Sequence, residues 1–262
     1  MSAIILDGSM VHYEALGRGR PIIFLHGWVG SWRYWINAMQ AASTSFRAYA
    51  IDLFGFGDTV RSENNYTIEK QALLLERFLN EMGIGKVALV GHDLGALVAF
   101  EYLKKHYESV DRMMTIGVPL QYETLATRMR TAPTTELAEW LSARQPEALT
   151  ALADASKADP LAVTTSMSSL QVDGIFPNVR NFGVPCLFVY GANDPAFTTV
   201  PSQETGNLPI HMHQINLEGS GHYPMLDNVS QFNRLLIDFL ALDSGASPSE
   251  LQMKEEWKRR VR

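Results

Sequence analysis

The segment that most constrains this chain is an apolar run that leads into a glycine-flanked aspartate. Residues 88–96 read Ala-Leu-Val-Gly-His-Asp-Leu-Gly-Ala, and an Ala/Leu/Val-rich stretch follows them. Glycines two positions before and two positions after Asp93 leave room for a sharp turn from a strand into a helix. Such a turn exposes the central side chain at the helix N-terminus. The pattern therefore predicts a nucleophile elbow that carries aspartate instead of serine.

A carboxylate at this point favours a different chemistry from a serine hydroxyl. It is already ionised near neutral pH and can displace a leaving group from a saturated carbon, whereas serine must lose a proton and attacks acyl carbons. The expected substrates shift from esters toward alkyl halides and epoxides. No serine occupies the elbow, so a serine esterase is disfavoured.

Composition indicates one large core and a small-molecule substrate. The 262 residues are 46% hydrophobic and 19% charged, which is typical of a single α/β domain with an insertion. The formal charge of −6 gives no basic field for nucleic acid or an anionic membrane, so neither partner is expected. No apolar run reaches the roughly 18 residues of a membrane span, and the first residues have no leader-like pattern. We expect a soluble cytoplasmic protein, as a monomer or homodimer.

The lone Cys186 lies in an apolar run and is expected to be a buried core thiol.

Alternating apolar and amphipathic segments predict a mainly parallel sheet of about eight strands, flanked by helices. The expected strands are Ala3–Leu6, Val11–Ala15, Ile22–Leu25, Arg47–Ile51, Val87–Val90, Arg112–Ile116, Leu187–Tyr190 and Ile210–Leu217. The expected helices are Ser31–Ala42, Ile68–Met82, Leu94–Tyr107 and Val229–Leu240.

The alternation stops between residues 119 and 183, where helical patterns such as Thr135–Arg144 and Pro146–Ala155 follow one another. This predicts an inserted helical cap at 119–183 and a core domain formed by 1–118 and 184–262. The charged stretch Glu250–Arg262 is interpreted as a solvated terminal helix or frayed end.

An aspartyl ester needs a base that activates water, and His222 is the best candidate of the seven histidines. It lies in a glycine-rich loop directly after the last predicted strand. His92, beside the nucleophile, and His26, after the third strand, are interpreted as supporting residues.

The histidine also needs a carboxylate that holds its tautomer, and Asp194 follows the next-to-last predicted strand. The order Asp93, Asp194, His222 is the order of nucleophile, acid and histidine expected of this strand–turn–helix arrangement. The alternative acid position, after Arg112–Ile116, holds Gly117 and no carboxylate.

Negative charge on the Asp93 carboxyl group requires hydrogen-bond donors in an oxyanion hole. The backbone N–H groups of Leu94, at the helix N-terminus, and Trp28, after the third strand, are the candidates. The Trp28 indole could contact a departing halide or a substrate oxygen, or could pack among neighbouring aromatic residues; both interpretations stay open.

Five motifs in order resemble the α/β-hydrolase superfamily, and they lie at residues 26–28, 52–58, 91–95, 191–194 and 219–222. The Gly-His-Asp-Leu-Gly elbow resembles the branch that contains epoxide hydrolases, haloalkane dehalogenases and haloacetate dehalogenases. This resemblance implies an α/β-hydrolase fold, a triad of Asp93, Asp194 and His222, and no metal or cofactor.

The chain departs from each subfamily at accessory positions. Leu94 stands where epoxide hydrolases and haloalkane dehalogenases have tryptophan and where fluoroacetate-type enzymes have a basic residue. Val29 replaces a proline of epoxide hydrolases, and Tyr122 stands alone where those enzymes use two cap tyrosines. Trp28 and Trp140 are the indole candidates for a halide. The expected pocket residues are thus Trp28, Tyr122 and Trp140.

These observations predict a hydrolase that acts on a small apolar electrophile, an epoxide or a carbon–halogen bond, through an aspartyl ester. Two alternatives stay open. One is an altered member of the fold with another reaction, such as a lyase, an isomerase or an ester hydrolase. The other is a protein that binds a ligand without turnover.

Overall fold

The computed structural model describes residues 2–120, 122–142, 153–170, 180–198, 208–243 and 246–251. Their centre is an eight-stranded sheet of order β1-β2-β4-β3-β5-β6-β7-β8, in which β1 and β2 run antiparallel to their neighbours and the other strands are parallel. The strands are β1 Ser2–Leu6, β2 Ser9–Gly17, β3 Arg20–Leu25, β4 Phe46–Ile51, β5 Val87–His92, β6 Val110–Ile116, β7 Cys186–Gly191 and β8 Met212–Leu217.

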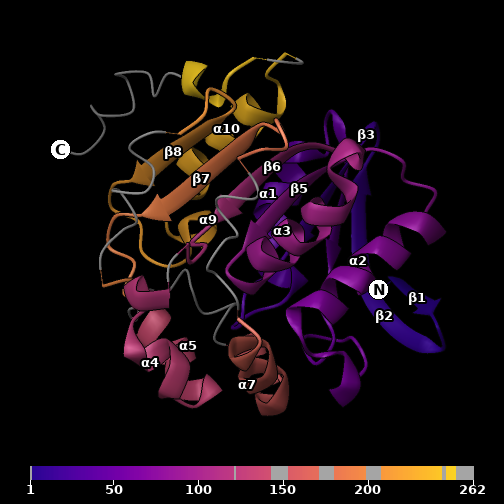
Figure 1. Cartoon of the computed structure of the whole chain (residues 1–262), viewed down its shortest axis with the longest axis vertical. Helices are drawn as coiled ribbons and strands as arrows, with labels where there is room; N and C mark the ends of the chain where they lie inside the picture. The colour runs from indigo at the N-terminus through magenta and orange to yellow at the C-terminus, as the bar shows by residue number, and fades with distance from the viewer. Residues whose placement is uncertain are drawn as a thin grey trace.

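Helices cover both faces of this sheet. In Figure 1, α2 and α3 lie in front of the strands and α1 and α10 lie behind them, which agrees with the packing of α2 on α3 and of α1 on α10. The α-helices are α1 Ile36–Ala42, α2 Ile68–Glu81, α3 Leu94–His106, α4 Thr127–Thr131, α5 Thr134–Leu141, α7 Pro160–Ser168, α9 Pro224–Asp227 and α10 Val229–Leu240. The 3-10 helices are η1 Trp32–Trp35, η2 Glu63–Asn65, η3 Tyr107–Ser109, η4 Tyr122–Thr124 and η7 Pro248–Glu250.

The predicted fold class is confirmed, and each predicted strand overlaps an observed one. The predicted helix Ser31–Ala42 is wrong in its first turn, which is the 3-10 helix η1 and is followed by α1. The Ser31 side chain caps this turn by accepting a hydrogen bond from Arg33 N–H. The side chain of Cys186 is buried at the start of β7, as expected, and burial raises the pKa of its thiol.

The segment between β6 and β7 contributes helices η4, α4, α5 and α7, and Figure 1 shows α4, α5 and α7 together at the bottom of the view. The predicted helix Thr135–Arg144 corresponds to α5. Of the predicted helix Pro146–Ala155, residues 153–155 are helical and the rest lie outside the described residues. Residues 252–262 of the charged tail lie outside them as well. Within the described ranges no helix has the length and apolar character that would let it cross a membrane.

Two glycines allow α3 to start directly against the sheet. A Cβ atom on Gly91 would lie 2.6 Å from Ala96 Cα, and one on Gly95 would lie 2.3 Å from the Leu25 carbonyl oxygen. Both distances are far below van der Waals contact and involve main-chain atoms, which cannot rotate away. Glycine at these two positions is therefore a packing requirement of the turn between β5 and α3.

Gly95→Ala is expected to destabilise the protein although alanine is the better helix former. In a free helix the change would stabilise by about 1 kcal/mol. Here the added methyl overpacks β3, so we expect the free energy of unfolding to fall by about 1–3 kcal/mol or more. Urea unfolding measures the effect. Gly85→Ala is the control, because nothing lies within 4 Å of its added Cβ; equal stability of the two variants would contradict the packing argument.

Candidate active site

Asp93 occupies the sharp turn between β5 and α3. Its backbone has φ 48° and ψ −114°, and Asp93 and Asp7 are the non-glycine residues with positive φ in the described part of the chain. This conformation is strained for an L-residue and persists only where surrounding contacts hold it. The side chain is placed at the N-terminus of α3, where the helix dipole favours a negative charge. The predicted elbow is therefore present as a conformation.

The side chains of Asp93, Asp194 and His222 meet at the carboxyl ends of the parallel strands. His222 Nε2 lies 2.8 Å from Asp93 Oδ2, and His222 Nδ1 lies 3.0 Å from each carboxylate oxygen of Asp194. Asp194 follows β7 and His222 follows β8. All three residues are buried. The structure thus brings together the three residues that the sequence nominated as a triad.

The two carboxylates determine the protonation of His222. Burial acts to lower the pKa of the imidazole, but the charges of Asp194 and Asp93, together with hydrogen bonds to both, raise it well above its usual value. The resting site therefore holds an imidazolium between two carboxylates, with a donor N–H directed at each. Asp93 Oδ1 has no hydrogen-bond partner in the described part of the chain.

The Gly27–Trp28 peptide lies beside Asp93. A Cβ atom on Gly27 would lie 2.8 Å from Asp93 Cβ and 3.0 Å from Asp93 Oδ2. His26 Nδ1 donates to the carbonyl oxygen of Gly27 at 2.8 Å, and its Nε2 accepts from Leu53 N–H at 3.0 Å. Because C=O and N–H point in opposite directions across a trans peptide, His26 fixes the direction of the Trp28 N–H. Leu94, the other predicted donor, begins α3 directly after Asp93.

His92 contacts protein groups on both sides of its ring. Its Nδ1 lies 3.0 Å from the Tyr34 hydroxyl, and its Nε2 lies 3.0 Å from the main-chain oxygen of His222. Burial lowers the pKa of His92 to about 4, so the ring is neutral at physiological pH. His26 and His92 therefore both have the supporting positions that we expected.

The three expected pocket residues, Trp28, Tyr122 and Trp140, lie in three different surroundings. Trp28 is buried, and its indole N–H donates to Ser166 Oγ of α7 at 2.9 Å, so the indole binds the inserted segment. Tyr122 is 38% exposed, and the guanidinium of Arg130 lies over its ring. Trp140 is partly buried under the guanidinium of Arg128. Within the described part of the chain, these contacts of Tyr122 and Trp140 do not join them to Asp93, Asp194 or His222, and their role in a pocket stays a prediction.

Sequence reasoning did not find Ser166 or Tyr34 as partners of the site. Ser166 is one of several serines and threonines in α7, and Tyr34 lies in a run of aromatic residues that suggests packing alone. Ser166 contacts Trp28 across 138 positions of sequence, and Tyr34 contacts His92 across 58. No local pattern marks such pairs.

Among the residues that the structure describes, two clusters of histidine and carboxylate side chains are close enough to be considered for a metal. They are His92–Asp93–His222 and His12–Asp52–Asp58. In the first, the ring nitrogens already face carboxylates, a hydroxyl and a carbonyl. In the second, Asp52 accepts from Trp32 N–H, Asp58 N–H and His12, while Asp58 pairs with Lys157 and Arg33. Both arrangements fit hydrogen-bonded ion pairs better than metal sites.

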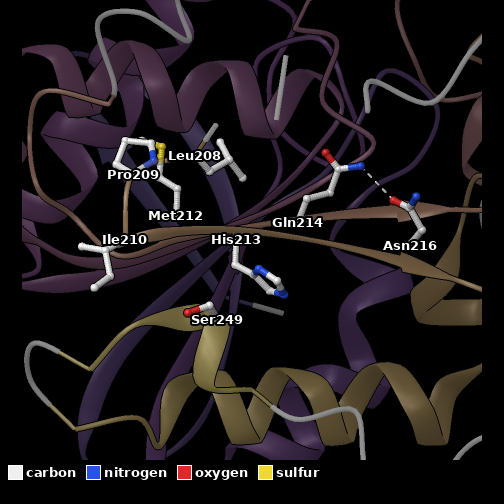
Figure 2. Close-up of a pocket in the computed structure, with 8 residues that line it drawn as sticks. All are labelled: Leu208, Pro209, Ile210, Met212, His213, Gln214, Asn216 and Ser249. Carbon is white, nitrogen blue, oxygen red and sulfur yellow. Dashed lines mark hydrogen bonds between the residues drawn. The ribbon is translucent and has the colours of Figure 1, made fainter. Parts of the chain in front are cut away.

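A groove of about 470 Å³ lies along the edge strand β8 (Figure 2). Gln214 donates to Asn216, two positions along on the same strand. None of Asp93, Asp194 and His222 lines this groove, so volume alone does not locate the catalytic chemistry. The lining residues are Leu208, Pro209, Ile210, Met212, His213, Gln214, Asn216 and Ser249.

Comparison with known proteins agrees with the geometry. A family model described as the alpha/beta hydrolase fold matches residues 20–168. The soluble epoxide hydrolase of Corynebacterium sp. (strain C12) is 31% identical over 114 residues, which cover 44% of this chain and 40% of that protein. Epoxide hydrolase 2 of Siraitia grosvenorii is 33% identical over 120 residues, 45% of this chain and 38% of that protein. The matches thus span less than half the length of these curated relatives.

Solved structures show the same architecture over nearly the whole chain. A thermophilic esterase from Thermogutta terrifontis superposes with a TM-score of 0.78 at 19% identity, covering 91% of this chain and 97% of that one. An epoxide hydrolase superposes with a TM-score of 0.71 at 18% identity, covering 92% and 98%. At these identities the likeness shows the fold alone. The resemblance predicted from the five motifs is confirmed.

The pKa of His92 predicts a pH-dependent stability. The unfolded chain takes up a proton on this residue below about pH 6.5, whereas the folded protein does so only near pH 4. The unfolded state therefore binds more protons between these values, and stability falls as the pH falls through this window, by about 3 kcal/mol from this residue. His222 has a raised pKa in the folded protein, so its contribution to stability is complete below about pH 6.5. This contribution is lost as the pH rises above that value and therefore does not affect the window of His92.

Urea unfolding at pH 4.0, 5.0 and 6.5 measures this effect. His92→Gln removes the titrating ring, so its stability is expected to fall less steeply than that of the native sequence over the same interval. Equal slopes in the two proteins would show that His92 is not a neutral buried imidazole.

Proposed function

Because the chain belongs to the α/β-hydrolase fold family, we propose that it is a hydrolase that forms a covalent ester on Asp93 and acts on a small apolar electrophile, an epoxide or a carbon–halogen bond. The observation that carries the proposal is the placement of His222 between the carboxylates of Asp93 and Asp194, with Asp93 in the strained turn before α3. A carboxylate in that turn is an ionised nucleophile that needs no base for its first step.

In the first step a lone pair of Asp93 Oδ1 attacks the electrophilic carbon. This oxygen is assigned to the attack because it carries no hydrogen bond within the described residues, while Oδ2 faces His222 and the Gly27 peptide. A C–O bond forms and the bond from carbon to the leaving group breaks, with its electron pair leaving on the halide or on the epoxide oxygen. The alkoxide from an epoxide then takes up a proton from water.

Ester formation prepares the second step. It removes the negative charge of Asp93, which is one of the two charges that raise the pKa of His222. The imidazolium therefore becomes more acidic, loses a proton to water and can act as a base, oriented by Asp194. His222 then takes a proton from water, whose oxygen attacks the carboxyl carbon of Asp93. Negative charge develops on Oδ2, for which the Trp28 and Leu94 N–H groups are the proposed donors. Collapse of this intermediate breaks the bond between the carboxyl carbon and Oδ1, and the departing alkoxide takes up the proton from His222 and leaves as an alcohol or diol.

Two observations bear on the leaving group. The curated relatives are named as epoxide hydrolases, which supports an epoxide. All nine tyrosines lie in the described part of the chain, and the single tyrosine of the inserted segment, Tyr122, is exposed beneath Arg130. A halide leaves as a stable anion and needs no tyrosine as a proton donor. This arrangement supports carbon–halogen substrates as the second candidate.

Intact-mass spectrometry of His222→Gln tests the proposal. The variant is incubated separately with styrene oxide, 1-bromobutane and bromoacetate. Loss of the base stops the reaction at the ester, so one equivalent of adduct is expected, with normal turnover abolished. An epoxide adds its whole mass as a hydroxyalkyl ester, whereas a halide substrate adds only its alkyl or carboxyalkyl group. The adduct mass therefore separates the two candidate reactions.

Asp93→Asn is the control and is expected to form no adduct. An adduct of equal amount on Asp93→Asn would contradict the assignment of the nucleophile. Normal steady-state turnover by either variant would contradict the mechanism, and no adduct from any probe would favour a different reaction or ligand binding.

A single turnover of the native sequence in H₂¹⁸O gives an independent prediction. Because water attacks the carboxyl carbon of Asp93, the label is expected in that carboxylate and not in the product of this turnover. Mass spectrometry of the peptide that contains Asp93 measures the incorporation. Label found only in the first product would indicate direct attack of water on the substrate instead.

A further inference from the structure

A continuous series of buried hydrogen bonds connects the loop after β3 with the loop that carries His222. The Gly27 N–H donates to the Tyr34 hydroxyl, which lies 3.0 Å from His92 Nδ1. His92 Nε2 lies 3.0 Å from the main-chain oxygen of His222. The four residues come from the β3 loop, η1, the end of β5 and the β8 loop. The series therefore joins three segments that are far apart in sequence.

Each link in this series has one possible direction. The His222 carbonyl can only accept, so His92 Nε2 carries the proton and Nδ1 of the neutral ring is an acceptor. The Tyr34 hydroxyl must then donate to Nδ1, and its oxygen receives the Gly27 N–H. The tautomer of His92 and the orientation of the Tyr34 hydroxyl are both fixed by their partners.

His92 connects this series of hydrogen bonds to the nucleophile, because it is the residue directly before Asp93. His92 precedes Asp93, so its hydrogen bond to His222 ties the main chain of the base to the residue next to the nucleophile. The loop that carries His222 contains Gly219, with φ +75°, and Gly221, and glycines restrict a main chain little. At the other end, the Gly27 peptide lies against Asp93. Both ends of the series therefore meet the same carboxylate.

We infer that Tyr34 and His92 are positioning residues, which hold the main chain of His222 and the Gly27–Trp28 peptide in register with Asp93. The inference rests on the function proposed above and adds two residues to that site. Neither residue contacts the reacting atoms in this role. His92 acts through the His222 main chain, and Tyr34 acts through His92 and Gly27.

Loss of a positioning residue should affect the rates of the two chemical steps differently. Ester formation needs the attack of Asp93 and depends little on the position of His222. Ester hydrolysis needs His222, a water molecule and the Trp28 N–H at correct distances, and a displacement of about 1 Å can slow such a step about 100-fold. Loss of either positioning residue should therefore slow hydrolysis more than formation and make the ester accumulate.

Three variants and a matched control test the inference. Tyr34→Phe removes one hydroxyl and keeps the ring. His92→Phe removes both hydrogen bonds of the imidazole, whereas His92→Gln can still place an N–H donor near the former Nε2 and is the rescue variant. Tyr190→Phe is the control, because the Tyr190 hydroxyl is also buried and donates to a main-chain oxygen, that of Val118, outside this series.

Rapid-quench mass spectrometry with styrene oxide or 1-bromobutane, whichever forms the ester, measures the two steps. We expect ester hydrolysis to slow about 10- to 100-fold in Tyr34→Phe and His92→Phe, with ester formation within about threefold of the native rate. His92→Gln should recover most of the loss, and Tyr190→Phe should accumulate no ester. Equal slowing of both steps, or equal effects in Tyr190→Phe, would overturn the inference.

A measurement without substrate separates this inference from the proposed function. The proton on His222 Nδ1, hydrogen-bonded to Asp194, is observed by NMR of protein labelled with ¹⁵N-histidine. Its resonance should move or broaden in Tyr34→Phe and His92→Phe and stay in place in Tyr190→Phe. An unchanged resonance overturns positioning, whatever the activity. A changed resonance in a protein that forms no ester supports positioning and refutes the proposed reaction.

Discussion

The whole site depends on the conformation of one residue, Asp93, at the junction of β5 and α3. A positive φ at a non-glycine residue is unfavourable, so the local chain would relax if its neighbours allowed it. Gly91 and Gly95 let α3 approach β3 so closely that no side chain fits between them. The sheet, itself buried on both faces at β3 and β5, resists any adjustment. Core packing therefore maintains the strained turn that places the Asp93 carboxylate at the N-terminus of α3.

A second constraint is electrostatic. Two buried carboxylates share one imidazolium, so the triad carries an excess negative charge away from water, which is costly unless nearby dipoles offset it. The N-terminus of α3 supplies such a dipole at Asp93, and Ala196 N–H donates to Asp194 Oδ1 at 2.8 Å. Consumption of the Asp93 charge in an ester would relieve this excess. The ground-state arrangement thus favours the step that the proposed mechanism requires.

The sequence predicted the sheet and the three meeting side chains because both follow from local patterns. Short β-rich apolar runs ending in Gly, Asp or His mark parallel strands and the loops at their carboxyl ends. The supporting contacts have no such mark: Tyr34 reaches His92 from an aromatic run, and Ser166 reaches Trp28 from the inserted segment. The first turn of the predicted helix at Ser31 was wrong because apolar periodicity does not distinguish a 3-10 turn from the first turn of an α-helix. Contacts between side chains that are far apart in sequence can be identified only in the folded structure.

The inserted segment is bound to the core through the same residue that lies beside the nucleophile. The main chain of Trp28 turns its N–H away from the His26 contact, while its indole donates to Ser166 in α7. The Asp159 N–H, just before α7, donates to the Gly55 oxygen at 2.7 Å, and the Tyr66 hydroxyl donates to the Asp159 carboxylate at 2.8 Å. The indole and the main-chain N–H belong to one residue, so the contact with α7 is made by the residue that is proposed to supply an oxyanion-hole donor. The inserted segment is therefore linked to the proposed site through Trp28.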